Sequence, residues 1–217
     1  TVLSVTSSIK PRVIIVAGPT AAGKSALSLA IAEEFSGVII NADSQQRYAD
    51  LRVLTSRPSV ADEGRAPHKL FGDLAAHESG SAAEWALKAA AEIQTAVTAQ
   101  KLPILVGGTG LYFRALMEGL TDMPAVPEGA RAAAKALLDE ICNAAFHANL
   151  AKHDAVTAAR LNPGDTQRLL RAWEVVEATG KPLSAWHEGA ATPPLDAVYF
   201  SVLLLPPRAE LYAACDA

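Results

Sequence analysis

The sequence predicts an α/β fold in which a parallel sheet is flanked by helices and interrupted by an all-helical insertion. Short apolar runs alternate with helical patterns in the first half of the 217-residue chain. Only helical patterns follow between residues 128 and 188, and an apolar run at residues 197–205 indicates a return to the sheet. Because strands that alternate with helices form βαβ units, we expect a parallel sheet with helices on its faces.

The first strand is predicted at residues 13–16, followed by the octet G-P-T-A-A-G-K-S and a helix over residues 25–35. In that helix Leu27, Ile31 and Phe35 share one face at four-residue spacing. The octet fits the P-loop pattern, in which glycines admit a phosphate and the amides and helix N-terminus attract it. We therefore expect a P-loop NTPase-like fold. The residues expected to hold the phosphates are Gly18, Pro19, Thr20, Ala21, Ala22, Gly23, Lys24 and Ser25.

Within this loop, Lys24 and Ser25 carry the expected chemistry. The Lys24 ammonium is expected to reach the outer phosphate, and the Ser25 hydroxyl to ligate Mg²⁺.

The second strand is predicted at residues 37–41 and leads to Asp43 and Ser44. The carboxyl ends of parallel strands share one edge of the sheet, so we expect Asp43 to face the phosphate site. There it acts as a general base or as an acid that organises a metal; the alternative is a turn or N-cap aspartate. Gln45 and Gln46 add amides that can bind an adenine edge.

Residues 51–73 show no clear period and are interpreted as a loop with short irregular pieces. The next helix is predicted to begin at Ser81 with a capping box to Glu84. Its apolar positions recur every four residues, at Trp85, Ala89, Ile93 and Val97.

A third strand is predicted at residues 102–106, and a glycine turn at residues 107–110 leads into a helix at 111–118. This turn lies at the same sheet edge, where it can admit a substrate close to the backbone with the Thr109 hydroxyl as donor. A purely structural turn is an equal alternative.

Composition shifts after Pro124 and Pro127, which places a helical insertion at residues 124–188. The core is then formed by residues 11–123 and 189–217, after a flexible leader at 1–10. The helix at 165–179 is amphipathic, with Leu169, Ala172, Trp173 and Val176 on one arc and Gln167, Arg168, Arg171 and Glu174 on the other. The polar arc either binds phosphates and base edges or is a solvated face.

The net charge of −4 argues against a general nucleic-acid coat protein but not against a local basic groove. The two cysteines, Cys142 and Cys215, lie far apart, which is typical of a reducing cytoplasm. The histidines lack metal-ligand spacing, so no zinc site is expected. No apolar run approaches the roughly 20 residues of a membrane span.

Four segments together resemble the tRNA dimethylallyltransferase family, in order and spacing, from Arg12 to Ser184. They are G-P-T-A-A-G-K-S, A-D-S-Q-Q-R-Y, L-P-I-L-V-G-G-T-G-L-Y-F-R-A-L and D-T-Q-R-L-L-R-A-W-E-V-V-E-A-T-G-K-P-L-S. The second segment departs from the family, because Gln45 and Arg47 replace its usual Met and Val, and outside the four segments Lys69 replaces a His.

The resemblance implies transfer of a dimethylallyl group from its diphosphate to N6 of an adenosine beside the tRNA anticodon. Asp43 would accept the amine proton, the P-loop would hold the diphosphate, and Mg²⁺ would be the cofactor. The expected partners are the tRNA anticodon stem-loop and dimethylallyl diphosphate, with no membrane, and the protein is expected to be a cytoplasmic monomer. The implied tRNA contacts are Asp43, Ser44, Gln45, Gln46, Thr109, Arg131, Gln167, Arg168, Leu169, Leu170 and Arg171.

Two other functions stay open on the residues alone: a small-molecule kinase that uses ATP, and a P-loop nucleotide switch without group transfer. The sequence also ends about ten residues after Arg208, within a predicted helix. Members of the resembled family are longer and carry further arginines there. On that ground we expect this chain to bind its ligands weakly and to transfer the group poorly.

Overall fold

The computed structural model of the protein describes residues 10–121, 123, 125–186, 189 and 191–216. It divides into two compact units, Thr1–Leu120 with Pro193–Ala217, and Thr121–Thr192, and each is described by itself. The expected leader lies outside the described residues except for Lys10, as do positions 124 and 188, the expected ends of the insertion.

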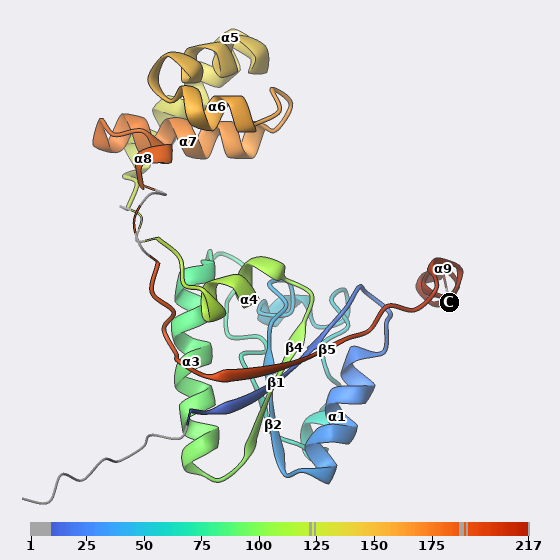
Figure 1. Cartoon of the computed structure of the whole chain (residues 1–217). Coiled ribbons are helices and arrows are strands. Elements are labelled where there is room, and N and C mark those ends of the chain that lie inside the picture. The colour runs from blue at the N-terminus through green and yellow to red at the C-terminus, as the bar shows by residue number, and fades with distance from the viewer. Residues whose placement is uncertain (1–9, 122, 124, 187–188, 190, 217) are drawn as a thin grey trace, which may run out of the picture. The chain divides into compact units, whose positions relative to one another are not determined.

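The first unit is built on a parallel sheet in the order β3-β2-β4-β1-β5 (Figure 1), which confirms the predicted fold class. In the described residues its strands are β1 (Arg12–Ala17), β2 (Gly37–Asn41), β3 (His68–Lys69), β4 (Leu102–Gly107) and β5 (Val198–Leu203). All neighbouring pairs run parallel, so the chain leaves every strand at the same edge of the sheet. The loops after β1, β2 and β4 therefore meet there.

The two-residue strand β3 lies in the segment that was expected to be loop. His68 and Lys69 pair with Ile39 and Ile40 of β2. A strand this short has no periodic pattern, so nothing in its own sequence indicates it. The segment also contains the short 3₁₀ helix η1 (Ala49–Leu51) and helix α2 (Val60–Arg65).

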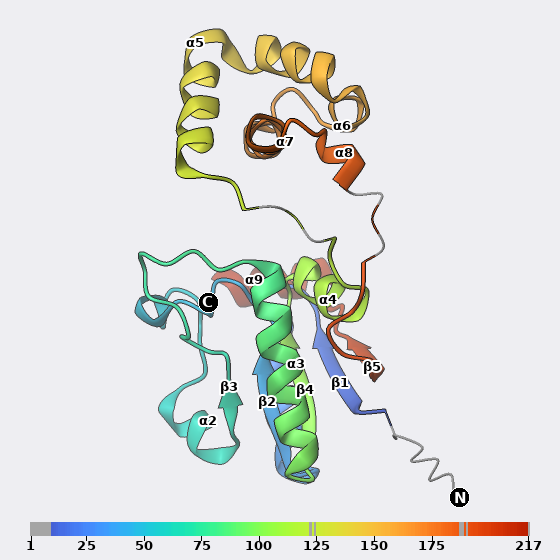
Figure 2. The same cartoon turned by 90° about the vertical axis from the view of Figure 1, so that its left-hand side faces the viewer.

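Helices cover both faces of the sheet (Figures 1 and 2). Helices α3 (Ala82–Thr98) and α4 (Gly110–Met117) pack on one face, where Trp85, Ile93 and Leu116 are fully buried. Helix α1 (Lys24–Glu34) packs on the other face through Leu29 and Ala32.

The buried stripe of α1 differs from the predicted one. Leu27 and Ile31 are only partly buried, and Phe35 is 61% exposed at the end of the helix. The four-residue spacing identified the helix correctly. However, the buried residues are Ser28, Leu29 and Ala32, and a pattern of large apolar residues does not indicate the two small ones.

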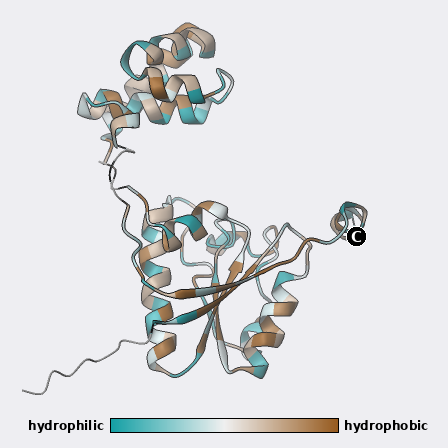
Figure 3. Cartoon of the chain, in the orientation of Figure 1, coloured by the Kyte–Doolittle hydropathy of each residue, from teal (hydrophilic) through white to brown (hydrophobic). Residues whose placement is uncertain are grey.

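The first unit ends with β5 and helix α9 (Arg208–Asp216). Figure 3 shows β5 in hydrophobic colours, and its apolar side chains are largely exposed, with Phe200 at 53% and Leu203 at 60%.

In the described residues of the second unit all regular secondary structure is helical: α5 (Glu128–His153), α6 (Ala155–Arg160), α7 (Thr166–Thr179) and α8 (Leu183–Trp186). Helix α5 is broken at Cys142, whose φ of 60° and ψ of 162° are not helical. The core joins Phe146 and Leu150 of α5 to Leu169 and Ala172 of α7. In α7 the third buried residue is Val175 rather than the expected Val176. None of the described helices is both long and apolar enough to cross a bilayer.

Candidate active site at the carboxyl edge of the sheet

The P-loop connects β1 to α1 and ends at Gly23. Gly23 has a φ of 86° in the left-handed region, which a glycine adopts without strain, and α1 begins at the next residue. The sequence thus places a flexible residue where the chain must turn sharply into the helix.

The Lys24 side chain lies across the P-loop. Its Nζ donates a hydrogen bond to the Pro19 carbonyl at 2.6 Å. Partial burial lowers the pKa of Lys24 below its ordinary value, and attraction to Asp43 opposes that shift. Asp43 therefore lies within electrostatic range of the P-loop lysine. Ser25 is exposed beside it.

Asp43 is positioned by Asn41, the last residue of β2, which is fully buried. The Asn41 side chain accepts a hydrogen bond from the Asp43 amide and donates to the Asp43 carbonyl, each at 2.9 Å. The same Nδ2 donates to the Leu70 carbonyl, and the Trp85 indole donates to the Asn41 carbonyl at 2.8 Å. Sequence reasoning missed Asn41, although an amide at the end of a buried strand is a usable signal.

The Asp43 carboxylate forms part of a tight turn. Its Oδ1 accepts a hydrogen bond from the Gln45 amide at 2.9 Å, so the turn role that the sequence left open is present. Within the described part of the chain no hydrogen bond is made to Oδ2. One carboxylate oxygen therefore orients the group, and the other is available for chemistry.

The glycine turn after β4 packs directly against the Asp43 loop. A Cβ on Gly107 would lie 2.2 Å from the Ala42 carbonyl, so only glycine fits at this crossing. The Thr109 amide donates to the Ala42 carbonyl at 3.2 Å, and the Thr109 hydroxyl accepts from the Ser44 amide at 3.0 Å. The structural role of the turn is thus evident, and it brings Thr109 beside Ser44.

The two glutamines behave differently. Gln45 is exposed, whereas the Gln46 side-chain amide donates to the Thr55 carbonyl at 2.8 Å and to that of Ser56 at 3.3 Å. The donor of Gln46 is therefore engaged by the protein, which leaves Gln45 as the amide that is exposed to a partner.

The residues expected to contact tRNA in the helical unit fall into two groups. Arg131, Gln167 and Arg168 are exposed, and Arg171 is partly exposed. The arginines form surface ion pairs with Glu128, Asp165 and Glu174. In contrast, Leu169 is fully buried and Leu170 packs against the same core. The side chain of Leu169 is therefore a core side chain rather than an exposed tRNA contact, and a contact through the main chain of this residue stays a prediction.

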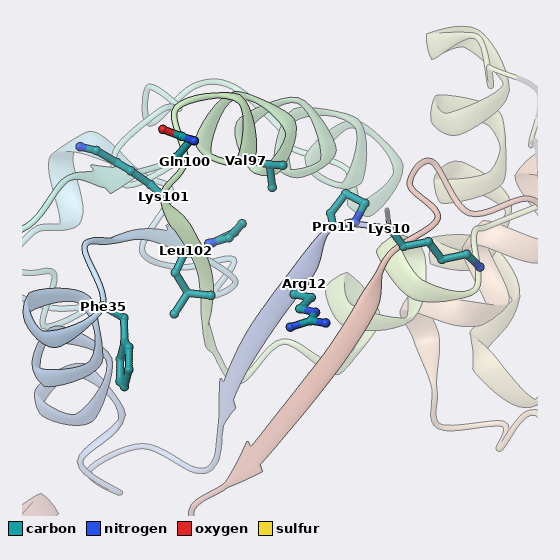
Figure 4. A pocket seen from close by; sticks show the side chains of 9 residues that line it. Lys10, Pro11, Arg12, Phe35, Val97, Gln100, Lys101 and Leu102 are labelled. Atoms are coloured by element: carbon teal, nitrogen blue, oxygen red, sulfur yellow. The ribbon is translucent and has the colours of Figure 1, made fainter. Parts of the chain in front are cut away.

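A separate hollow of about 490 Å³ lies at the opposite edge of the sheet, where β1 and β4 begin (Figure 4). The side chains of Lys10, Arg12 and Lys101 on its rim point in different directions, so they do not form an anion cradle. None of the predicted site residues lines it.

Metal ligation at the P-loop edge would have to rely on few protein groups. Among the described residues, no cluster of three or more His, Cys, Asp or Glu side chains is arranged to hold a metal ion. The Ser25 hydroxyl and the Asp43 carboxylate are hard oxygen donors. This set fits Mg²⁺, which commonly binds through one or two protein oxygens together with substrate phosphates.

Fold and site together define a P-loop class of α/β protein with an acidic group beside the phosphate cradle. The chain matches two known protein families. The family described as IPP transferase matches residues 46–217, and that described as isopentenyl transferase matches residues 11–71. The chain belongs to the IPP transferase family.

Curated relatives include a tRNA dimethylallyltransferase of Rhodospirillum centenum, 54% identical over 94% of this chain and 66% of the relative. Another, of Paramagnetospirillum magneticum, is 52% identical over 97% of this chain and 67% of the relative. The chain thus spans about two thirds of the length of the curated relatives that it matches.

Solved structures of transferases that act on tRNA are also similar to this chain. A eukaryotic dimethylallyltransferase acting on tRNA has a TM-score of 0.71 at 26% identity, over 89% of this chain and 48% of that protein. The tRNA isopentenylpyrophosphate transferase of Staphylococcus epidermidis has a TM-score of 0.57 at 30% identity, over 94% of this chain and 66% of that protein.

Proposed function

We propose that the protein transfers a dimethylallyl group from dimethylallyl diphosphate to N6 of an adenosine next to the tRNA anticodon. The observation that carries the proposal is the meeting of Lys24, Asp43 and Thr109 at one edge of the sheet, in a chain of this family. The names of the curated relatives support it, as does the structural neighbour described as a dimethylallyltransferase acting on tRNA.

The P-loop would hold the diphosphate. Transfer breaks the bond between C1 of the dimethylallyl group and the diphosphate oxygen, which leaves with the electron pair. Negative charge grows on that oxygen, and donors aimed at it lower the barrier most. Lys24 would exchange its bond to the Pro19 carbonyl for one to the phosphate, at little cost in reorganisation because both acceptors lie beside the loop.

Mg²⁺ bound by the Ser25 hydroxyl would supply further positive charge at the leaving group. The protein's own part is to orient the diphosphate through the loop amides and the N-terminus of α1.

Asp43 would be the general base. The lone pair of an exocyclic adenine amine is delocalised into the ring, so the amine is a weak nucleophile. As N6 bonds to C1, its proton would move to Oδ2 of Asp43, while Oδ1 stays hydrogen-bonded to the Gln45 amide. A positioned base of this kind contributes about 10²–10⁴ in rate. The adenine has to leave its stack to reach such a site.

The helical unit would contact tRNA through Arg131, Gln167, Arg168 and Arg171. The ion pairs of Arg131, Arg168 and Arg171 with neighbouring carboxylates lie at the surface, and such pairs contribute only about 0–1 kcal/mol. Exchanging them for phosphates therefore costs little.

The alternative of an ATP-dependent small-molecule kinase is not favoured by the relatives, which are named as tRNA dimethylallyltransferases. Calorimetry separates the two functions. We expect dimethylallyl diphosphate with Mg²⁺ to bind more tightly than ATP with Mg²⁺. Much tighter binding of ATP would overturn the proposal in favour of the kinase.

A further inference from the structure

The fully buried Arg47 lies four residues after Asp43 and has no role in the mechanism above. We propose that Arg47, paired with Asp73, is a positioning residue that fixes the loop carrying Asp43. The part of this proposal that concerns catalysis rests on the proposed function. The part that concerns the loop does not.

Arg47 is held in a charge-balanced cluster. Its Nε and Nη2 donate to the two oxygens of Asp73 at 2.9 and 2.6 Å, and Nη2 also reaches Glu84 at 3.3 Å. Lys88 completes the cluster, 3.2 Å from Asp73 and 2.7 Å from Glu84. Two cations thus face two carboxylates. The bidentate geometry fixes the direction of the guanidinium as well as its distance from Asp73.

Main-chain hydrogen bonds join the same two segments. The Leu74 amide donates to the Arg47 carbonyl at 2.9 Å, and the Gly72 amide donates to the Gln46 carbonyl at 3.0 Å. Asp73 lies between these two donors. Side chain and main chain therefore tie residues 46–48 to residues 72–74 as one piece.

Helix α3 holds the loop at both ends. Before Asp43, the Trp85 indole donates to the Asn41 carbonyl. After Asp43, Glu84 contacts Arg47 directly, and Lys88 contacts it through Asp73. The Glu84 side chain is used here rather than in the capping box expected at Ser81, where only the Ser81 hydroxyl acts as a cap. Glu84 and Trp85, which are neighbours in helix α3, thus contact Arg47 and Asn41, and these two contacts set the position of the segment from Asn41 to Arg47.

A stabilising role alone does not account for an arginine at this position. Burying an ion pair is often no better for stability than burying apolar side chains of similar size. The bidentate pair fixes the direction of the Arg47 guanidinium relative to Asp73, and an apolar contact would not do so.

The test is hydrogen exchange of the ligand-free protein, read by peptide, in Arg47→Met, Arg47→Lys and a control. The control is Arg65→Met, which removes a bidentate pair with Glu33 at 2.7 and 2.8 Å on the exposed surface of the same unit. We expect Arg47→Met to speed exchange about tenfold or more at residues 42–48, where the Asp43, Ser44 and Gln45 amides are bonded, and to leave β1 and α1 unchanged. Arg47→Lys should restore part of the protection, and Arg65→Met should leave it intact.

Transfer kinetics provide the second measurement. Arg47→Met should lower kcat while the KM for dimethylallyl diphosphate stays near the wild-type value, since the P-loop is untouched. If the wild-type protein transfers no dimethylallyl group, the proposed function fails, and the exchange experiment still decides the role of Arg47.

Two outcomes would overturn the proposal. One is wild-type exchange at residues 42–48 in Arg47→Met; the other is an equal rise in exchange over the whole unit. Should Arg47→Met not fold, the double variant Arg47→Met/Asp73→Leu removes both charges and leaves Lys88 paired with Glu84. Wild-type exchange at 42–48 in that variant would equally refute a positioning role.

Discussion

Asp43 owes its position to hydrogen bonds from neighbouring side-chain and main-chain groups. Asn41 holds its backbone, the Gln45 amide holds one carboxylate oxygen, and Thr109 holds the neighbouring Ser44. At the scale of single residues, the site is therefore a rigid edge with one unengaged carboxylate oxygen. Substitutions of Asp43 and Lys24 test the proposed roles of these two residues most simply.

Asp43→Asn keeps the shape and the hydrogen bond from the Gln45 amide but removes the base. We expect kcat for transfer to fall by about 10²–10⁴, with tRNA affinity changed far less. Single-turnover rates and a tRNA binding curve measure the two effects separately. A collapse of affinity with a surviving single-turnover rate would make Asp43 a binding residue.

Lys24→Ala removes the ammonium that lies over the loop. Hydrogen bonds to charged groups contribute about 1.5–3 kcal/mol, so the affinity for dimethylallyl diphosphate should fall by about 10- to 100-fold. The melting temperature should change little, because the only hydrogen bond that the Lys24 side chain makes in the described structure is to the Pro19 carbonyl. Calorimetry measures the loss, and unchanged affinity would place the diphosphate elsewhere.

At the scale of elements, the sequence predicts most of what the structure contains. The strands β1, β2, β4 and β5 and the helices α1, α3, α4 and α7 lie where periodicity placed them, because each is long enough to show its period. The two-residue β3 is too short for that. The site is predicted where a motif marks it, as at Gly23 and Asp43. Asn41 and the Arg47 cluster escaped prediction because their roles depend on contacts between residues 26 to 44 positions apart in the sequence.

Helix α7 presents Arg168 and Arg171 on its solvent side. Arg168→Glu/Arg171→Glu should weaken tRNA binding and reduce the slope of log K against log salt by about two, since two phosphate contacts are lost. Lys152→Glu/Arg160→Glu makes the same change in charge elsewhere in the unit and serves as control. Equal salt slopes for the wild type and the α7 variant would identify these arginines as an ordinary solvated face.

Asp154 joins α6 to α8 within the helical unit. It is 2% exposed and accepts hydrogen bonds from the Thr157 amide, the Ser184 amide and the Ser184 hydroxyl. Burial acts to raise the pKa of Asp154, but the bonds from Thr157 and Ser184 outweigh it and hold the pKa below its ordinary value. The stabilisation is therefore present above the unfolded pKa of about 3.9 and is lost as the pH falls through the lower folded pKa.

Asp154→Ala should destabilise the helical unit by roughly 1–3 kcal/mol near pH 6, and the difference from wild type should vanish in strong acid. Urea unfolding at a series of pH values measures this. Asp165→Ala, which removes a single cap bond of 3.3 Å at the start of α7, should cost less. An Asp154 effect that stays constant down to the lowest pH would contradict the assignment.

At the scale of the whole molecule, the chain consists of two units, each with its own apolar core. The sheet unit carries the P-loop and Asp43, and the helical unit carries the arginines of α7. In the proposed function the first unit performs the transfer and the second unit binds tRNA. The match to the IPP transferase family runs through both units.

The central claim is that Asp43 and the P-loop carry dimethylallyl transfer to tRNA. The most direct measurement incubates tRNA with dimethylallyl diphosphate, Mg²⁺ and an excess of protein, so that a single turnover suffices, and then analyses the nucleosides by mass spectrometry. We expect an adenosine that has gained one dimethylallyl group, formed by the wild type and strongly reduced with Asp43→Asn and Lys24→Ala. Equal amounts of modified adenosine from the wild type and Asp43→Asn, or none from the wild type, would contradict it.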